Sequence, residues 1–268
     1  MISEEKKKEN NFMKQPKNMP FKKVKMTVFT FIILCITVLI FISNLVFLFI
    51  NKKDSTKSIL VFNILESLLM FILIFIPNIF AKITKLKIPA SMEIMYIIFC
   101  TCSIILGEIG DFYAKFGWWD SLLHFSSGIL LGILGYVIIN TFNKYSSDKE
   151  FKFSPLFVSI WCICFSLAIG AIWEMIEFGC DEFFGTNMQQ FMESRGTLDS
   201  GVALIGHEAL KDTMKDISLD FLGSIIPSLI GFFELRKHKK GFANSYLEKE
   251  KEEMKKNKPV ILENKENN

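Results

Sequence analysis

The sequence lacks the features that assign chains to the common classes of soluble protein. It has no basic domain with interleaved aromatic residues, so nucleic acid is not an expected partner. No small-x-small cleavage site follows the first apolar run, 27–50, and this run is longer than the about 7–15 residues of a signal-peptide core. Arginine is scarce, since Arg195 and Arg236 are the only two. These absences argue against a nucleic-acid-binding domain and a cleaved signal peptide.

The six cysteines form no disulfide or metal framework. Two Cys-x-Cys pairs are present, Cys100 with Cys102 and Cys162 with Cys164, and both lie in apolar segments. Residues two apart on a helix point about 200° away from each other, so neither pair can hold one ion. We interpret the cysteines as small apolar residues.

Apolar residues, by contrast, are abundant and come in long blocks. Half of the 268 residues are hydrophobic, and 28 are Phe. A helix crosses a bilayer with about 20 residues at about 1.5 Å each. Six blocks reach that length: 27–50, 58–80, 91–112, 119–142, 153–179 and 216–235. The sequence therefore predicts an all-α integral membrane bundle of six transmembrane helices, occupying 27–235, in the cell membrane and with the lipid bilayer as a partner.

Basic residues are distributed unequally between the two sides of this arrangement. If the N-terminus lies inside, the inner loops and tails hold 24 of the 31 Lys and Arg residues, and the outer loops hold seven. Basic residues favour the cytoplasmic side, so we expect both termini in the cytoplasm. The regions 1–26 and 236–268 are then charged cytoplasmic tails, and 180–215 is the longest extracytoplasmic loop.

Ionisable side chains within the spans gather toward the outer ends of the last four helices. Inserting a charged group at the centre of a membrane helix costs about 2.5–3.5 kcal/mol, so each such residue requires a structural or functional explanation. Five lie deepest: His124, Glu174, Glu177, Asp216 and Asp220. Four more flank them nearer to the outer surface: Glu108, Asp111, Asp120 and Asp212.

The spacing of these residues places them on shared helix faces. Asp120 and His124 are four residues apart, so they lie on one face of a helix. Glu174 and Glu177 in the fifth span are three residues apart. At the start of the sixth span, an i, i+4, i+8 stripe is formed by Asp212, Asp216 and Asp220. Burying three polar stripes requires that the three helices face one another.

Several carboxylates and an imidazole on facing helices are typical of metal sites in helical bundles. Oxygen ligands suit Mg²⁺, Ca²⁺ or Mn²⁺, and an added histidine favours Mn, Fe or Zn. We therefore expect the deepest five residues to bind a divalent metal (Mg, Mn, Ca or Zn), with the four outer acids in supporting positions. Asp120 and Asp212 have a second interpretation, because acidic residues also cap helix N-termini.

The outer loop contains one further candidate. Arg195 could bind a phosphate or carboxylate group of a substrate, because guanidinium groups pair with such anions in a bidentate manner. A single loop arginine is more often simply solvated, and that interpretation stays open.

Four short motifs resemble the YjdF-like family of uncharacterised bacterial membrane proteins. They are WWDSLLHF at 118–125, AIWEMIEF at 171–178, FGTNMQ at 184–189, and DTMKD at 212–216 followed by DFLG at 220–223. The order of these acids also resembles the VanZ-like membrane proteins more loosely, because this chain has extra acidic positions and lacks the Lys next to the first Asp. The resemblance implies a multi-pass membrane protein with these site residues, and it implies no particular reaction.

Three functions are compatible with these observations. The first is a metal-dependent enzyme acting on a lipid or envelope substrate at the outer leaflet. The second is a cation or proton-coupled transporter, although no inverted repeat is recognisable in the sequence. The third is a non-catalytic envelope stress or resistance protein whose acidic site binds a ligand or supports the fold. The sequence leaves the oligomeric state open.

Overall fold

The computed structural model describes residues 27–84, 90–145, 153–193 and 201–236. Within these residues the chain is helical, with seven α-helices, one π-helical segment and a single isolated β-bridge between Met192 and Ala203. The elements are α2 (Val28–Ile50), α3 (Asp54–Thr84), α4 (Ala90–Cys100), η1 (Thr101–Ile109), α5 (Phe112–Lys115), α6 (Trp119–Tyr145), α7 (Pro155–Phe184) and α8 (His207–Arg236). The predicted tails, 1–26 and most of 236–268, lie outside the described residues, as does Arg195.

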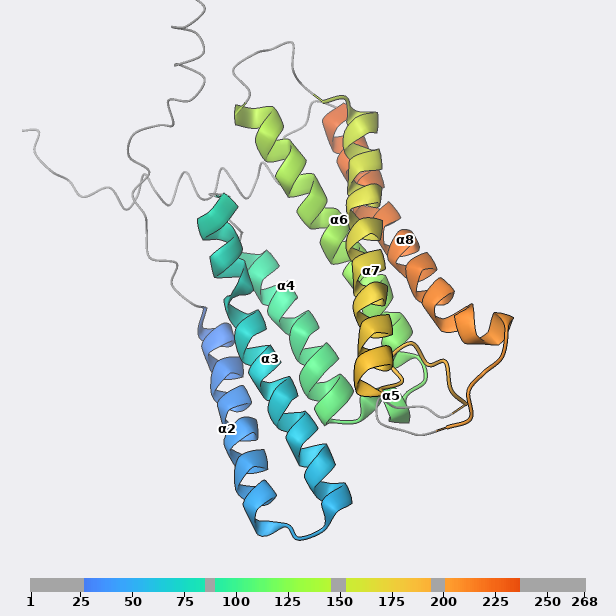
Figure 1. Cartoon of the computed structure of the whole chain (residues 1–268). Helices are drawn as coiled ribbons and strands as arrows, with labels where there is room; N and C mark the ends of the chain where they lie inside the picture. The colour runs from blue at the N-terminus through green and yellow to red at the C-terminus, as the bar shows by residue number, and fades with distance from the viewer. Residues whose placement is uncertain (1–26, 85–89, 146–152, 194–200, 237–268) are drawn as a thin grey trace, which may run out of the picture.

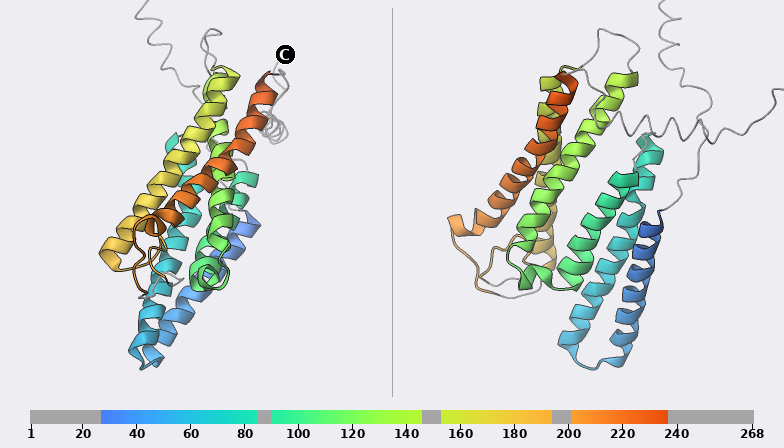
Figure 2. Two further views of the ribbon diagram at one scale, coloured as in Figure 1. Left: turned by 90° about the vertical axis from the view of Figure 1, so that its right-hand side faces the viewer. Right: turned by 180° about the vertical axis from the view of Figure 1, so that it is seen from behind.

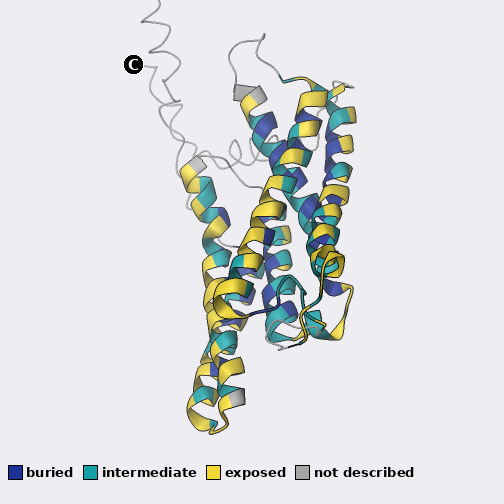
Figure 3. Ribbon diagram, turned by 45° about the vertical axis from the view of Figure 1, so that its right-hand side comes forward, coloured by how far each residue is buried: buried dark blue, intermediate teal, exposed yellow. Residues whose placement is uncertain are grey.

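Six helical segments in the described residues are long and apolar enough to cross a membrane, as the sequence predicts. Large apolar side chains such as Phe49, Leu39 and Met175 are exposed on their outward faces. Figure 3 shows exposed residues in yellow along the helices of the bundle and buried residues in dark blue where helices pack together. An apolar exterior along the full length of several helices is the surface that lipid requires.

The six spans form two groups of three. Helices α6, α7 and α8 pack most extensively on one another, and α2 and α3 pack beside α4 and η1 (Figures 1 and 2). The first group of spans in the chain buries an apolar core around Met70, Ile74 and Ile97. Contacts of α6 with α4 and η1 join the two groups.

Glycine and serine bring α6, α7 and α8 close together. A Cβ atom at Gly128 would overlap the backbone of Asp220, and one at Gly223 would overlap the carbonyl oxygen of Phe125. Ser159 of α7 and Ser228 of α8 each donate a hydroxyl hydrogen bond to the other's carbonyl, at 3.1 and 2.9 Å. Small residues that let backbones approach and hydroxyls that bond between helices are typical of membrane helix packing.

The third span contains a feature that the hydropathy pattern did not predict. Its second half, η1, is π-helical, and the amide of Gly110 donates to the carbonyl of Ile105 at 2.9 Å in the five-residue pattern of that helix. The span ends at Ile109, and the chain then turns at Asp111, whose φ of 60° is left-handed. Hydropathy reports only how apolar a segment is, so it cannot distinguish the two kinds of helix.

The last two helices are longer than the apolar blocks that predicted them. Helix α7 continues beyond 179 to Phe184 and ends where Gly185 takes a left-handed φ of 66°. Helix α8 begins at His207, directly after Gly206 with φ of 64°, and not at 216. The polar residues that fall outside the blocks at 180–184 and 207–215 are therefore helical, and the connection between these helices is shorter than 180–215.

The starts of α6 and α8 and the end of α7 lie at one end of the bundle, which we call the site end (Figure 1). Helix α8 ends at the opposite end, and α2 runs in the direction opposite to α8. This arrangement follows from an even number of crossings, and it places the candidate polar residues of three helices in one region.

Candidate metal centre at the site end

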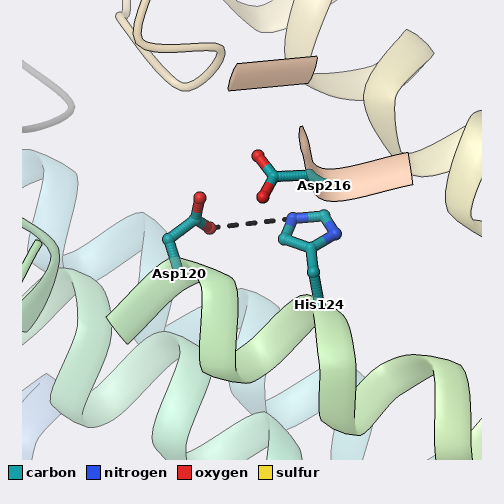
Figure 4. A group of neighbouring side chains, drawn as sticks. All are labelled: Asp120, His124 and Asp216. Atoms are coloured by element: carbon teal, nitrogen blue, oxygen red, sulfur yellow. Dashed lines mark ion pairs between the residues drawn. The ribbon is translucent and has the colours of Figure 1, made fainter. Parts of the chain in front are cut away.

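Three side chains from two helices converge at the site end. Asp120 and His124 come from the first turns of α6, and Asp216 comes from α8. One ligand atom from each lies within 4.8 Å of the other two, a spacing that one metal ion can bridge. Figure 4 shows both carboxylates turned toward the imidazole. Asp120, expected in a supporting position, therefore belongs to the central group.

The two nitrogen atoms of His124 face different partners. Nδ1 lies 3.3 Å from Oδ2 of Asp220, within hydrogen-bond distance. Nε2 lies 3.7 Å from Oδ1 of Asp120 and 3.9 Å from Oε1 of Glu174. An Nδ1–H that donates to Asp220 leaves the Nε2 lone pair directed at the other carboxylates, which is the tautomer that a metal-binding histidine needs.

Asp220 thus lies behind the histidine and not among the converging oxygens. Its Oδ1 also accepts a hydrogen bond from the hydroxyl of Ser127. The lack of a side chain at Gly170 makes room for this carboxylate, since a Cβ there would overlap Oδ2. Proteins commonly orient a histidine ligand in this way: a carboxylate accepts a hydrogen bond from one ring nitrogen, so that the other nitrogen faces the metal. The sequence predicts Asp220 as a ligand; in the structure it lies within hydrogen-bond distance of Nδ1 of His124, and its role stays a prediction.

Glu174 of α7 points into the same region. Its side chain is 5% exposed, and neither carboxylate oxygen has a hydrogen-bond partner among the described residues. Oδ1 of Asp216 is likewise buried without a hydrogen bond. A buried carboxylate oxygen without a hydrogen bond loses its hydration and gains only longer ionic contacts in return, here with His124 and Lys215, so such atoms favour binding of a ligand or a proton.

The remaining predicted residues pair with other side chains. Glu177 is buried one turn further along α7 and accepts a hydrogen bond of 2.7 Å from Nε1 of Trp173. Asp212 pairs with Lys215. Asp111 is exposed and lies 4.0 Å from the ammonium of Lys115.

Glu108 of η1 lies near Tyr113, in the short connection before α6. Burial raises the pKa of Tyr113 well above its ordinary value, and the carboxylates of Glu108, Asp120 and Glu177 raise it further, opposed by a hydrogen bond with Ser103. The phenol therefore stays protonated and can serve only as a neutral hydrogen-bonding group beside these acids.

A short loop after α7 covers the centre. The carboxylate of Asp181 accepts hydrogen bonds from the hydroxyl of Thr186 and from the amides of Met188 and Gln189. The loop then takes a left-handed φ of 47° at Gln190, whose side-chain amide donates to Oδ2 of Asp120 at 3.4 Å. Asp181 thus fixes the loop in the position from which it reaches the centre.

Several residues that build the site were not predicted as parts of it. Ser127, Gln189, Gln190 and Lys215 all contact site residues or the helices that carry them. For Ser127 a signal exists, because it follows His124 by three residues and so lies on the same helix face. For Gln189 and Gln190 the only signal is their place in the FGTNMQ motif and directly after it.

Comparison with known proteins gives a family and one relative. The family described as "Predicted membrane protein (DUF2238)" matches residues 32–237, a range that includes the whole centre. An "Uncharacterized protein" of Thermotoga maritima is 26% identical over 151 residues, which cover 56% of this chain. The chain spans 66% of the length of that relative. No solved structure matches the chain.

Proposed function

Because the chain belongs to the DUF2238 family of predicted membrane proteins, we propose that it is a membrane-embedded enzyme with a divalent-metal centre. Asp120, Asp216 and Nε2 of His124 are the proposed ligands, and Glu174 is the fourth. The observation that supports this proposal best is the group of three convergent ligand atoms beside buried carboxylate oxygens that have no hydrogen-bond partner.

The charges of the centre favour a cation. Asp120, Asp216, Asp220 and Glu174 lie around a single imidazole, and burial in an apolar bundle makes their mutual repulsion costly. A divalent ion would neutralise this charge and bind the oxygen atoms of Glu174 and Asp216 that have no hydrogen bond. One nitrogen and several oxygen ligands suit Mn²⁺ or Zn²⁺ better than Ca²⁺.

An enzyme is the proposed use because the centre lies at one end of the bundle and two residues of its edge are partly exposed. Asp120 and Lys215 are its partly exposed members. Trp118, half exposed, lies two residues before Asp120 in the chain, and aromatic residues favour the lipid–water interface. A metal with three or four protein ligands keeps a position for water or for a substrate oxygen. We propose a lipid or envelope component as the substrate, since it can reach the centre from the membrane surface.

The distribution of basic residues supports an orientation with both termini in the cytoplasm. Helices α2 and α8 run in opposite directions, as the first and last of six successive membrane crossings would, which supports placing both ends of the chain on one side. Since 24 of the 31 basic residues belong to that side, we propose that it is cytoplasmic and that the site end faces outward.

The metal content of the purified protein tests the centre directly. We expect the protein in detergent to hold about one divalent ion per chain, measured by mass spectrometry of the metal, and His124→Ala to lose it. Asp220→Ala is expected to keep the site but weaken it about 10–100-fold, because it removes only the group that orients His124. Glu182→Gln, an exposed acid of the same helix as Glu174, is the control and should bind metal normally. A wild-type protein without metal, after growth and purification with Mn²⁺ and Zn²⁺, would contradict the proposal.

The envelope lipids of a strain that lacks the gene test the enzymatic part. We expect a lipid or lipid-linked envelope component to accumulate, and a plasmid with the wild-type gene to restore the normal profile. The His124→Ala gene should fail to restore it although its product reaches the membrane in normal amount, because the metal supplies the reactive group. An unchanged envelope, or full restoration by His124→Ala, would exclude a metal-dependent enzyme acting there.

A further inference from the structure

Lys215 is the one lysine or arginine among the described residues that contacts the carboxylates of the centre. Its ammonium hydrogen-bonds to Asp212, and it lies 3.6 Å from Oδ1 of Asp216 and 4.0 Å from Oδ2 of Asp120. It therefore makes its hydrogen bond with an acid outside the proposed ligand set. Toward the two proposed ligands it makes only longer ionic contacts.

The side chain of Lys215 is able to move away from these ligands. It is 40% exposed, whereas the side chains of Asp120 and Asp216 are 16% and 2% exposed. A lysine ammonium is a point charge on a flexible stem of four carbons, and Asp212, whose side chain is 13% exposed, can keep its hydrogen bond to it. The two carboxylates are fixed by burial, so the cation is the mobile partner.

We propose that the ammonium of Lys215 and a divalent cation compete for the carboxylates of Asp120 and Asp216, so that Lys215 holds the centre together without metal and sets its affinity for metal. This inference rests on the proposed metal centre and adds its regulation. A divalent ion within a few ångströms of an ammonium is repelled by it, so both cations cannot occupy these oxygens favourably. Gain of the metal requires that Lys215 withdraw toward Asp212 and solvent.

The affinity for Mn²⁺ measures this competition. Lys215→Met removes the ammonium and keeps the length of the side chain, and we expect it to tighten Mn²⁺ binding about tenfold or more. Lys211→Met is the matched control: Lys211 lies one turn earlier on α8, is 67% exposed and pairs with Glu208 at 3.2 Å. Because it removes the same charge away from the centre, it should change the affinity less than about twofold.

A small ammonium ion can then be used to restore the competition. In Lys215→Ala, n-butylammonium should raise the apparent dissociation constant of Mn²⁺ in proportion to its concentration, as a competitor does. Tetramethylammonium at the same ionic strength carries the same charge but has no N–H group, so it should have no such effect. In the wild-type protein both ions should leave the affinity unchanged, because Lys215 already occupies the position.

The outcomes separate the inference from the function on which it rests. Mn²⁺ bound by the wild-type protein with equal or lower affinity in Lys215→Met would overturn the competition and leave the metal centre intact. Equal effects of the two ammonium ions on Lys215→Ala would also overturn it, because general screening would then explain the result. Absence of Mn²⁺ binding in every protein would remove the metal centre and the competition together.

Discussion

Replacing Glu174 by glutamine is expected to change stability in opposite directions with and without metal. Under chelation the variant should be more stable than the wild-type protein by about 1–3 kcal/mol, because it removes a buried charge that has no hydrogen-bond partner. With Mn²⁺ in excess the wild-type protein should become the more stable of the two, since an ion that binds the folded state stabilises it in proportion to the logarithm of its concentration. Thermal unfolding in detergent, followed by tryptophan fluorescence with EDTA or Mn²⁺, measures both differences.

Glu182→Gln is the control for this reversal, because Glu182 is exposed on the same helix. Its effect should be small and the same in both conditions. If Glu174→Gln were destabilising under chelation as well, its carboxylate would have a favourable partner in the metal-free protein, and the case for Glu174 as a metal ligand would fail.

Gly223→Ala is expected to destabilise the bundle by about 3 kcal/mol or more, or to prevent its accumulation in the membrane. The added Cβ would overlap the carbonyl oxygen of Phe125 and would lie 3.2 Å from the Cα of Gly128. These are backbone atoms of α6, which cannot move aside as a side chain can, so α6 and α8 would have to separate. Because Asp216 lies on α8 and His124 on α6, metal binding should be lost with the packing.

The same substitution at Gly179 provides the comparison. No atom lies within 4 Å of a Cβ built there, so Gly179→Ala should be neutral or stabilise α7 by up to about 1 kcal/mol. The yield of folded protein and the midpoint of thermal unfolding distinguish the two variants. Similar behaviour of Gly223→Ala and Gly179→Ala would contradict the close approach of α6 and α8.

The number of spans and the helices that carry polar groups could be predicted from the sequence. Long apolar blocks have one stable arrangement in a bilayer, so hydropathy alone yields six spans. Spacing within one helix is equally informative, because residues four apart share a face: Asp120 and His124 lie 3.7 Å apart in the structure. Gly128 and Gly132 are four residues apart on α6, the spacing that lets membrane helices approach, and a Cβ at either position would overlap atoms of α8.

The assignment of atoms across helices could not be predicted. The stripe of Asp212, Asp216 and Asp220 fixes a helix face but not which carboxylate meets which nitrogen of His124, because that depends on the rotation and height of α8 against α6. The approach of these helices brings Asp220 to Nδ1 and leaves Asp216 with the group around Nε2. The end of α7 and the start of α8 could not be predicted for a different reason. The last turn of α7 and the first turns of α8 are polar and extend past the apolar blocks.

The position of Gly170 against Asp220 has a consequence for how sequences of this family can diverge. The carboxylate of Asp220 fills the space in which a side chain at 170 would stand. A mutation of Gly170 to a larger residue therefore displaces the group that orients His124, and it becomes tolerable only if position 220 shortens as well. Although positions 170 and 220 lie on different helices, substitutions at the two positions should therefore occur together among related chains.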